Sequence, residues 1–297
     1  IDMESLADFA AWCDELVPYD AYDPVKGKDV RMEEPRYRLN LVIDTEMSAA
    51  DALATICKST RATAYWHGDK LRFKYDDVVD GHRQLFGMGN IVHDSYTETY
   101  VGLTEIPNQV EARFLDEDNN YKQQTVAVFD SSRINEPVNS KTINLYGVTK
   151  YTQVKRELVY ALKKLRSIRR FVSFEVGIEG VVAEVGDVIL FSHDTPQYGY
   201  SGRVSKVEGG RIYFDRPVDA VFGAWHSAVF SVNGSIVEHK FVARSETVEY
   251  VDIEGHTVTE GCAYSAGLLK KEAIPLRIMS VKNTSKFTVK LECEEYN

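Results

Sequence analysis

Hydrophobic and polar residues near the start of the chain alternate first with a helical and then with a strand period. After Ser5, which can cap a helix, apolar residues recur at the 3.6-residue period and stop before Pro18. Residues 20–35 are polar and have no period, which predicts a loop. Residues 36–44 alternate apolar and polar side chains as a half-buried strand does. The pattern therefore predicts a helix, a loop and a strand.

A second capped helix and a hairpin complete this first region. Ser48 is followed three residues later by Asp51 and then by an apolar helical face, which predicts an N-terminal capping box. Residues 62–75 alternate around a His-Gly-Asp turn and predict a β-hairpin. We therefore expect a small α+β domain over residues 1–78, followed by a glycine-rich linker over residues 79–90.

Beyond the linker the pattern is mostly that of strands, interrupted by one helix. Alternating residues flank the acidic turn 116–120 and predict a second hairpin. Apolar residues from 150 to 168 keep helical spacing, and Thr149 precedes them as a predicted N-cap. Residues 172–178 return to period two. These elements predict an α+β domain over residues 91–180.

Short strands separated by turns are expected in the rest of the chain. The pattern is typical of a barrel or sandwich, so we predict a β-barrel-like domain over residues 181–297 whose final hairpin, 275–293, packs back on the 91–180 region. The predicted fold class is α+β, a small α+β domain followed by β-rich barrel-like domains with one long amphipathic helix. The turn signals are Gly186-Asp187, Gly209-Gly210, Asn233-Gly234, Glu254-Gly255 and residues 283–286.

Composition and charge exclude several classes of protein. The chain has 297 residues, 44% of them hydrophobic and 27% charged, which is the composition of a globular protein and not of a fibrous or disordered one. Its formal charge of -10 argues against tight binding of nucleic acid over a broad basic surface. No window is long and apolar enough for a membrane span. The first residue is Ile1, without a signal peptide, so we expect a piece of a longer chain. Four scattered cysteines predict reduced thiols and synthesis in a cytoplasm.

Motifs for catalysis, cofactors or metals are incomplete. Gly199-Tyr200-Ser201-Gly202 resembles a nucleophile elbow, but Arg203 occupies the second glycine position. Gly87-Met88-Gly89 lacks the third glycine of a dinucleotide loop. The acidic turn 116–120 lacks the glycine and the bidentate glutamate of a calcium loop, so an Asx-rich turn is favoured. We therefore predict no catalytic, cofactor-binding or metal-binding residues, and no cofactor.

The segment from residue 150 to residue 170 carries an excess of basic side chains against one acid, Glu157. Such a helix face can bind nucleic acid, but in an acidic chain a solvated face or a contact with an acidic neighbouring subunit is favoured. We therefore predict Lys155, Lys163 and Arg166 as candidate subunit-interface residues. The basic residues are Lys150, Lys155, Arg156, Lys163, Lys164, Arg166, Arg169 and Arg170.

The order of segments over most of residues 36–293 resembles the tail-tip attachment proteins of lambda-like long-tailed bacteriophages and related putative phage tail proteins. Val185 departs from the family, which usually has proline there. The segments that carry the resemblance are residues 37–44, 48–61, 64–73, 108–110, 114–121, 147–149, 172–177, 186–188, 202–204, 215–217 and 276–278.

This resemblance implies a structural protein of the virion tail tip, made in the bacterial host cytoplasm. In it, three copies form a hub ring that joins the tail tube to the host-attachment apparatus and lets DNA pass. The implied partners are copies of the chain and other tail proteins, with a host receptor contacted through regions outside this sequence. It implies no catalytic residues.

Two other functions stay open at this point. Seventeen Tyr and three Trp residues are compatible with a carbohydrate-binding or adhesin module, which clustered exposed aromatic residues around a groove would favour. A cell-wall-degrading hydrolase of phage entry would need a pair of carboxylates, whose separation a sequence does not give.

Overall fold

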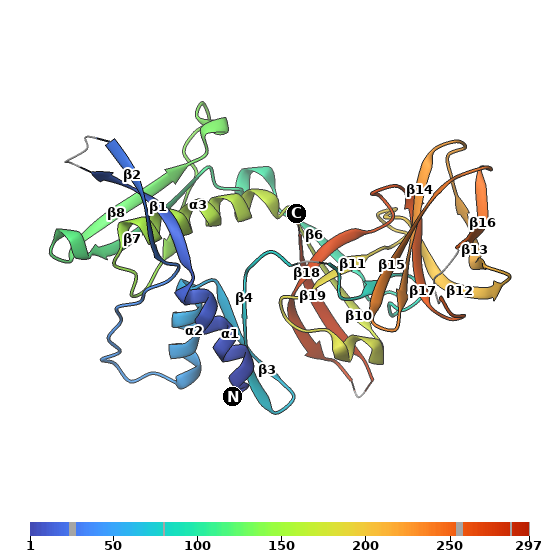
Figure 1. Cartoon of the computed structure of the whole chain (residues 1–297), viewed down its shortest axis with the longest axis horizontal. Helices are drawn as coiled ribbons and strands as arrows, with labels where there is room; N and C mark the ends of the chain where they lie inside the picture. The colour runs from blue at the N-terminus through green and yellow to red at the C-terminus, as the bar shows by residue number, and fades with distance from the viewer. Residues whose placement is uncertain (24–27, 80, 254–257, 286, 297) are drawn as a thin grey trace. The chain divides into compact units, whose positions relative to one another are not determined.

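The protein is β-rich, and its described residues form three α-helices (Figure 1). The computed structural model describes residues 1–23, 28–79, 81–253, 258–285 and 287–296. The chain folds into two compact units, which we call unit 1 and unit 2. Unit 1 combines residues 1–77 with 101–167, and unit 2 combines residues 78–100 with 168–297. The expected 91–180 region thus contributes to both units.

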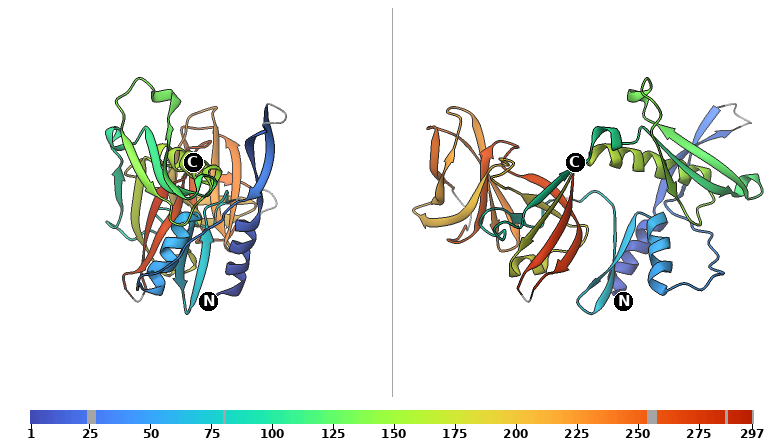
Figure 2. Two further views of the ribbon diagram at one scale, coloured as in Figure 1. Left: turned by 90° about the vertical axis from the view of Figure 1, so that its left-hand side faces the viewer. Right: turned by 180° about the vertical axis from the view of Figure 1, so that it is seen from behind.

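In unit 1, two helices pack against a two-stranded hairpin (Figure 2). The ring of Phe9 stacks on that of Phe73 at 5.9 Å, and Trp12 stacks on Tyr75 at 4.6 Å, so aromatic side chains form much of this core. The N-cap at Ser48 is confirmed, since its hydroxyl accepts a hydrogen bond from the Asp51 N–H at 3.1 Å and donates one to the Asp51 carboxylate at 2.7 Å. The predicted hairpin is also confirmed. The elements are α1 (Met3–Asp14), α2 (Ala49–Ser59), β3 (Ala62–His67) and β4 (Lys70–Tyr75).

The region after α1 differs from the prediction. Instead of continuing toward Pro18, the helix ends at Asp14, and β1 (Leu16–Asp23) pairs antiparallel with β2 (Lys28–Pro35). The predicted loop was therefore wrong. A two-stranded ribbon has two edge strands and accepts Pro18, and it has no fully buried face that would give the sequence a period.

Residues 36–44 do not form the predicted strand. Their N–H groups bind separate partners instead of one neighbouring strand: Tyr37 donates to the Cys13 carbonyl, and Asn40 donates to the Gly147 carbonyl. Tyr37 is buried, whereas Val42 is 84% exposed. The alternation arises because one side of an extended connection packs on the core.

A three-stranded sheet and the longest helix form the rest of unit 1. In this sheet, β7 (Gln109–Asp116) pairs antiparallel with β8 (Lys122–Phe129) and parallel with β9 (Ser140–Asn144). Helix α3 (Tyr151–Ser167) packs on β7 and β8, with Val154, Leu158 and Leu162 in the shared core. The second predicted hairpin and the long helix are therefore confirmed.

The described part of unit 2 contains two six-stranded sheets. The first has the order β5-β11-β18-β19-β10-β6 and is antiparallel except between β5 and β11. The final hairpin, β18–β19, is confirmed, and β19 pairs with β10. β5 lies inside the predicted linker, and its two side chains are buried. The strands are β5 (Leu85–Phe86), β6 (Thr97–Tyr100), β10 (Arg170–Val176), β11 (Val188–Phe191), β18 (Ile274–Asn283) and β19 (Val289–Glu295).

The second sheet has the order β15-β14-β17-β12-β13-β16 and curls around one open side (Figure 1). The turns at Gly209-Gly210 and Asn233-Gly234 are confirmed, and the predicted turn at Glu254-Gly255 lies outside the described residues. Because the sheet curls but its edge strands β15 and β16 do not pair with each other, we call it a half-barrel. Its strands are β12 (Tyr200–Glu208), β13 (Arg211–Asp219), β14 (Trp225–Val232), β15 (Ser235–Val242), β16 (Thr247–Asp252) and β17 (Ala263–Leu268).

Short 3-10 segments connect some of these elements. The last of those described begins at Ile178, which the prediction placed in a strand; the strand ends at Val176 instead. The segments are η1 (Leu103–Glu105), η2 (Glu117–Asn119), η3 (Ser131–Arg133) and η4 (Ile178–Val182).

Candidate functional site

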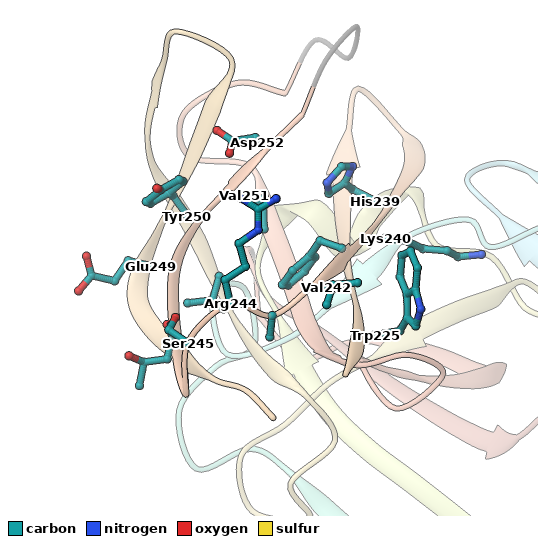
Figure 3. A pocket seen from close by; sticks show the side chains of 14 residues that line it. Trp225, His239, Lys240, Val242, Arg244, Ser245, Glu249, Tyr250, Val251 and Asp252 are labelled. Carbon is teal, nitrogen blue, oxygen red and sulfur yellow. The ribbon is translucent and has the colours of Figure 1, made fainter. Parts of the chain in front are cut away.

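A hollow of about 630 Å³ lies on the open side of the half-barrel, between its two edge strands β15 and β16 (Figure 3). The two strands are consecutive in the chain but lie at opposite ends of the sheet order, so they line the gap where the sheet does not close. Trp225, at the start of β14, completes the lining. Residues of β15, of β16 and of the loop between them therefore border a space that can hold a ligand.

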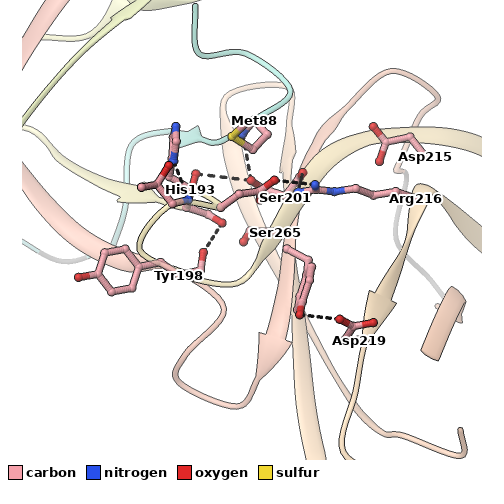
Figure 4. Close-up of polar contacts among 12 residues, drawn as sticks. Met88, His193, Tyr198, Ser201, Asp215, Arg216, Asp219 and Ser265 are labelled. Carbon is pink, nitrogen blue, oxygen red and sulfur yellow. Dashed lines mark hydrogen bonds and ion pairs between the residues drawn. The ribbon is translucent and has the colours of Figure 1, made fainter. Parts of the chain in front are cut away.

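A second feature, which we call the seam, joins the two sheets of unit 2 through residues 87–89 and 199–203 (Figure 4). The Ser201 hydroxyl accepts a hydrogen bond from the Met88 N–H at 3.0 Å and donates to the Ser192 carbonyl at 3.4 Å. Ser201 is only 1% exposed. Both partners of its hydroxyl are backbone groups, so Ser201 is a structural residue of the seam rather than a nucleophile.

Glycines let the two segments of the seam approach each other. A Cβ atom on Gly87 would lie 2.6 Å from the Cβ of Ser201 in the other segment. Gly202 is also closed on the side of its neighbouring strand β13, where a Cβ atom would lie 2.3 Å from an Asp215 carboxylate oxygen. Gly89 is equally tight, because its Cβ would lie 2.7 Å from the Gly202 carbonyl oxygen. The segments 199–202 and 87–89, which only partly match a nucleophile elbow and a dinucleotide loop, thus pack against each other. Both need glycine because their backbones approach closely.

Two arginines, Arg203 of the seam and Arg216 on the neighbouring strand β13, are held by acids and carbonyls of unit 2. Arg216 makes a two-point ion pair with Asp194, with both N···O distances at 2.7 Å, and donates to the Ser201 carbonyl at 2.8 Å (Figure 4). Arg203 donates to the Gly89 carbonyl at 2.8 Å and to Glu179 at 2.9 Å. The seam therefore uses its charges to fix backbone positions.

Helix α3 carries the predicted interface residues, but many of its charges are paired within unit 1. The Glu157 carboxylate is buried and accepts two hydrogen bonds from Arg61, at 2.7 and 2.9 Å. Several basic residues of the 150–170 segment pair with acids of unit 1. These pairs are Lys150–Glu117 (3.1 Å), Arg156–Glu34 (2.9 Å), Lys164–Asp76 (3.2 Å) and Arg166–Asp130 (3.0 Å).

Thr149 is used differently from the prediction. Its hydroxyl donates to Glu117 Oε2 at 2.6 Å and accepts from the Asn40 amide at 2.8 Å, so it ties two loops together at the start of α3. These contacts correct the predicted helix cap. The hydrogen bond from the Thr149 hydroxyl holds the pKa of Glu117 below its usual value, and the hydrogen bond and positive charge of Lys150 lower it further.

The three predicted interface residues differ in their surroundings. Lys155 and Lys163 are exposed and have no ion pair or side-chain hydrogen bond within the part of the chain that the structure describes. The side chain of Arg166 is 48% exposed, but its guanidinium pairs with buried Asp130. The two lysines can therefore meet another surface without breaking a described contact, and their role at an interface stays a prediction.

The acidic turn at 116–120 is an Asx turn, as predicted, since the Asp116 carboxylate accepts the Asp118 N–H at 3.1 Å. Among the described residues there is no group of three or more His, Cys, Asp or Glu side chains that could hold a metal ion. The four cysteines are free thiols. No described helix has the length and apolar character needed to cross a membrane.

The chain matches a known protein family and a named phage protein. A family model described as "Putative phage tail protein" matches residues 48–207, which is more than half of the chain. The chain is 30% identical over 226 residues to the tip attachment protein J of Escherichia phage SECphi27. That alignment covers 74% of this chain and 18% of the relative, so the chain spans about a fifth of the relative's length.

Several solved structures, including the following two, are similar to the chain at low identity. A virion of a native gene transfer agent particle gives a TM-score of 0.46 at 9% identity, with 84% of this chain and 40% of the other covered. A tail protein from Neisseria meningitidis MC58 gives a TM-score of 0.41 at 11% identity, with 85% and 57% covered. The family match and the 30% identical relative are independent of these, and from them it follows that this chain belongs to the family of putative phage tail proteins.

Proposed function

We propose that the chain is part of the hub at the tip of a phage or prophage tail. In this proposal, copies of it form a ring, with three copies as the expected number, that connects the tail tube to the host-attachment apparatus and leaves a passage for DNA. The observation that carries the proposal is the family match over residues 48–207, which includes segments of both units. The relative named as a tip attachment protein supports the position at the tip.

The charges of the chain support a passage for DNA rather than a DNA-binding surface. The formal charge is -10, and the basic residues of α3 and of the seam are largely engaged by acids of their own unit. DNA binding requires several unpaired cations that can replace the counterions of the phosphates. A ring built from acidic subunits repels the phosphates, so DNA passes without being held.

The work of such a protein is assembly, and α3 supplies a candidate contact. Lys155 and Lys163 are exposed and unpaired within the described residues, and Arg166 is partly exposed on the same helix. We expect these side chains to meet an acidic surface on a neighbouring copy or on another tail protein. An exposed contact of this kind weakens as salt screens the charges.

Electron microscopy of the parent particle, with this chain labelled, tests the position and the copy number. The proposal expects label in a ring at the tip, and label along the tube or absent from the tail would overturn it. Turnover of peptidoglycan by the purified chain would equally contradict a purely structural role.

Charge reversal in the phage tests the contact through α3. Lys155→Glu with Lys163→Glu should reduce the yield of complete tails, while the matched reversal Lys58→Glu with Lys122→Glu, on exposed lysines elsewhere in unit 1, should not. Arg166→Glu is tested separately, because it also loses the ion pair to Asp130. Normal tails from the first double variant would remove α3 from the interface.

A further inference from the structure

The hollow between β15 and β16 has the volume of a small-molecule site, and a packed core lies beneath it. Its volume of about 630 Å³ falls within the roughly 300–1,000 Å³ that such sites occupy. Val248 and Val251 line it and also belong to the buried core of the half-barrel, against which Phe241 packs. The floor of the hollow is therefore part of a packed core, while Arg244 and Ser245 line it from the loop between β15 and β16.

An unpaired cation faces this space. Arg244 is exposed and makes no hydrogen bond or ion pair with the residues that the structure describes, and Figure 3 shows its side chain running up the middle of the hollow. The acid on the same wall, Asp252, is paired with Arg211 at 3.0 Å. Figure 3 also shows Lys240 and Glu249 pointing outward, on opposite sides. Among the described lining residues, the charge offered to a ligand is therefore that of the Arg244 guanidinium.

Two exposed aromatic rings lie at the rims of the hollow. Trp225 is 58% exposed and Tyr250 is 39% exposed, and Figure 3 places Trp225 beside Lys240 at one rim and Tyr250 beside Glu249 at the other, with Arg244 between them. The Arg211 guanidinium lies 4.9 Å from the centre of the Tyr250 ring and helps to hold it in place. Exposed large rings beside a concave surface are typical of binding sites, because core packing does not account for them.

We propose that this hollow binds an acidic saccharide. The planar guanidinium of Arg244 matches a carboxylate or phosphate with two parallel hydrogen bonds, and the exposed face of Trp225 accepts the apolar face of a sugar ring. An apolar peptide would bury Arg244 without a partner, which costs free energy. A nucleic acid strand needs a row of cations along its backbone, whereas Arg244 is the unpaired cation that the described lining offers, and the chain is acidic.

This inference goes beyond the proposed hub, because it concerns a ligand and not assembly. It is tested on the purified full chain by titration calorimetry with three defined probes. These are trigalacturonate, which carries carboxylates, its neutral methyl ester, and glucose 6-phosphate. We expect trigalacturonate or glucose 6-phosphate to bind with a Kd below about 1 mM, and the one that binds identifies the acidic group.

Two substitutions separate the roles of charge and ring. Arg244→Gln should weaken the acidic probe by about tenfold or more and leave the methyl ester unchanged, because a charged, two-point hydrogen bond is lost. Trp225→Ala should weaken the acidic and the neutral saccharide alike. The matched controls are Arg113→Gln, an exposed arginine on β7, and Trp66→Ala, a 73% exposed tryptophan on β3; neither should change binding.

Several results would overturn the proposal. They are binding of none of the acidic probes, equal affinity of the wild type and Arg244→Gln, and tighter binding of an oligothymidylate than of either acidic sugar. Thermal melting checks that each variant is folded. Tail assembly by phage carrying Arg244→Gln reports on the hub separately, since it should stay normal whether or not the saccharide binds.

Discussion

Gly202 of the seam has no room for a side chain, because the neighbouring strand β13 lies against it. A methyl group on Gly202 would collide with the carboxylate of Asp215, which itself accepts hydrogen bonds from the Arg203 N–H and the Tyr264 hydroxyl and so has little freedom to move. We expect Gly202→Ala to lower the free energy of unfolding by about 1–3 kcal/mol, as overpacking does. Urea unfolding measures this change. Gly177→Ala, at a position with no atom within 4 Å of the added methyl, should be close to neutral; equal effects would contradict the tight packing around Gly202.

The buried pair of Arg61 and Glu157 should be stabilising only while both partners are present. Glu157→Gln leaves the Arg61 guanidinium without its counter-charge in a mostly buried position, and we expect a loss of about 3 kcal/mol in the free energy of unfolding. The double change Arg61→Met with Glu157→Leu should recover part of that loss, because an apolar pair leaves no charge unpaired. A Glu157→Gln variant as stable as Lys163→Gln would refute the role of the pair.

His193 should make unit 2 sensitive to mild acid. Its ring stacks on Tyr96 with 4.3 Å between centroids, and its Nδ1 accepts the Thr195 N–H at 3.1 Å. Burial lowers the pKa of His193, so folding favours the neutral ring. Its contribution is complete above the unfolded pKa of about 6.5 and is lost as the pH falls through the lowered folded pKa.

Melting temperatures between pH 7.5 and pH 5 test this expectation. The wild type should lose more stability over that range than His193→Phe, which keeps the stack but cannot be protonated. His93→Gln, at a side chain that is 86% exposed, serves as the control and should follow the wild type. Parallel curves for the wild type and His193→Phe would show that His193 does not titrate in this way.

At the scale of elements, the apolar side of α3 should contribute far more to stability than its exposed lysines. Leu158 is completely buried against β7 and β8, whereas Lys163 is exposed on the same helix. Leu158→Ala should reduce the free energy of unfolding by about 2–5 kcal/mol, and Lys163→Ala should change it by less than about 0.5 kcal/mol. Chemical denaturation compares the two, and equal tolerance would show that the helix is not packed as described.

The elements that could be predicted from the sequence are those with local signals. The cap at Ser48, the periodic leucines of α3 and the Gly-Gly and Asn-Gly turns each depend on neighbouring residues, and each was found. The β1–β2 ribbon was missed because neither face is fully buried. Residues 36–44 were assigned wrongly because one-sided packing imitates the period of a strand.

The sites were harder to predict than the elements. The glycine and serine motifs of the seam were visible in the sequence, but their mutual packing connects residues more than 100 positions apart, which no local pattern reveals. Arg244 could not be identified from the sequence either, because its candidate role as a ligand-binding residue depends on its having no ion-pair partner among the described residues. Pairing within the described part of unit 1 likewise engages Arg156 and Lys164 but not Lys155 or Lys163.

At the scale of the whole molecule, the chain passes between its two units three times, after residues 77, 100 and 167. Composition predicts a linker at residues 79–90, yet Leu85 and Phe86 of β5 are buried, and Gly87 and Gly89 belong to the seam. A segment can therefore be rich in glycine because it packs closely and not because it is loose. The domain limits expected from the sequence, with a first domain over residues 1–78 and a linker over residues 79–90, stay a prediction that proteolysis can test.

Limited proteolysis tests that prediction together with the two units. We expect protease to cut between residues 77 and 84, since Asp76 is bound by Tyr160 and Lys164 on one side and β5 follows on the other. The cut chain should give two bands on a denaturing gel but elute as one species at the full mass in size-exclusion chromatography. The reason is that residues 1–77 share unit 1 with residues 101–167 and stay attached through the contacts of α3. Separate elution of the N-terminal piece would show instead that residues 1–78 form an independent domain.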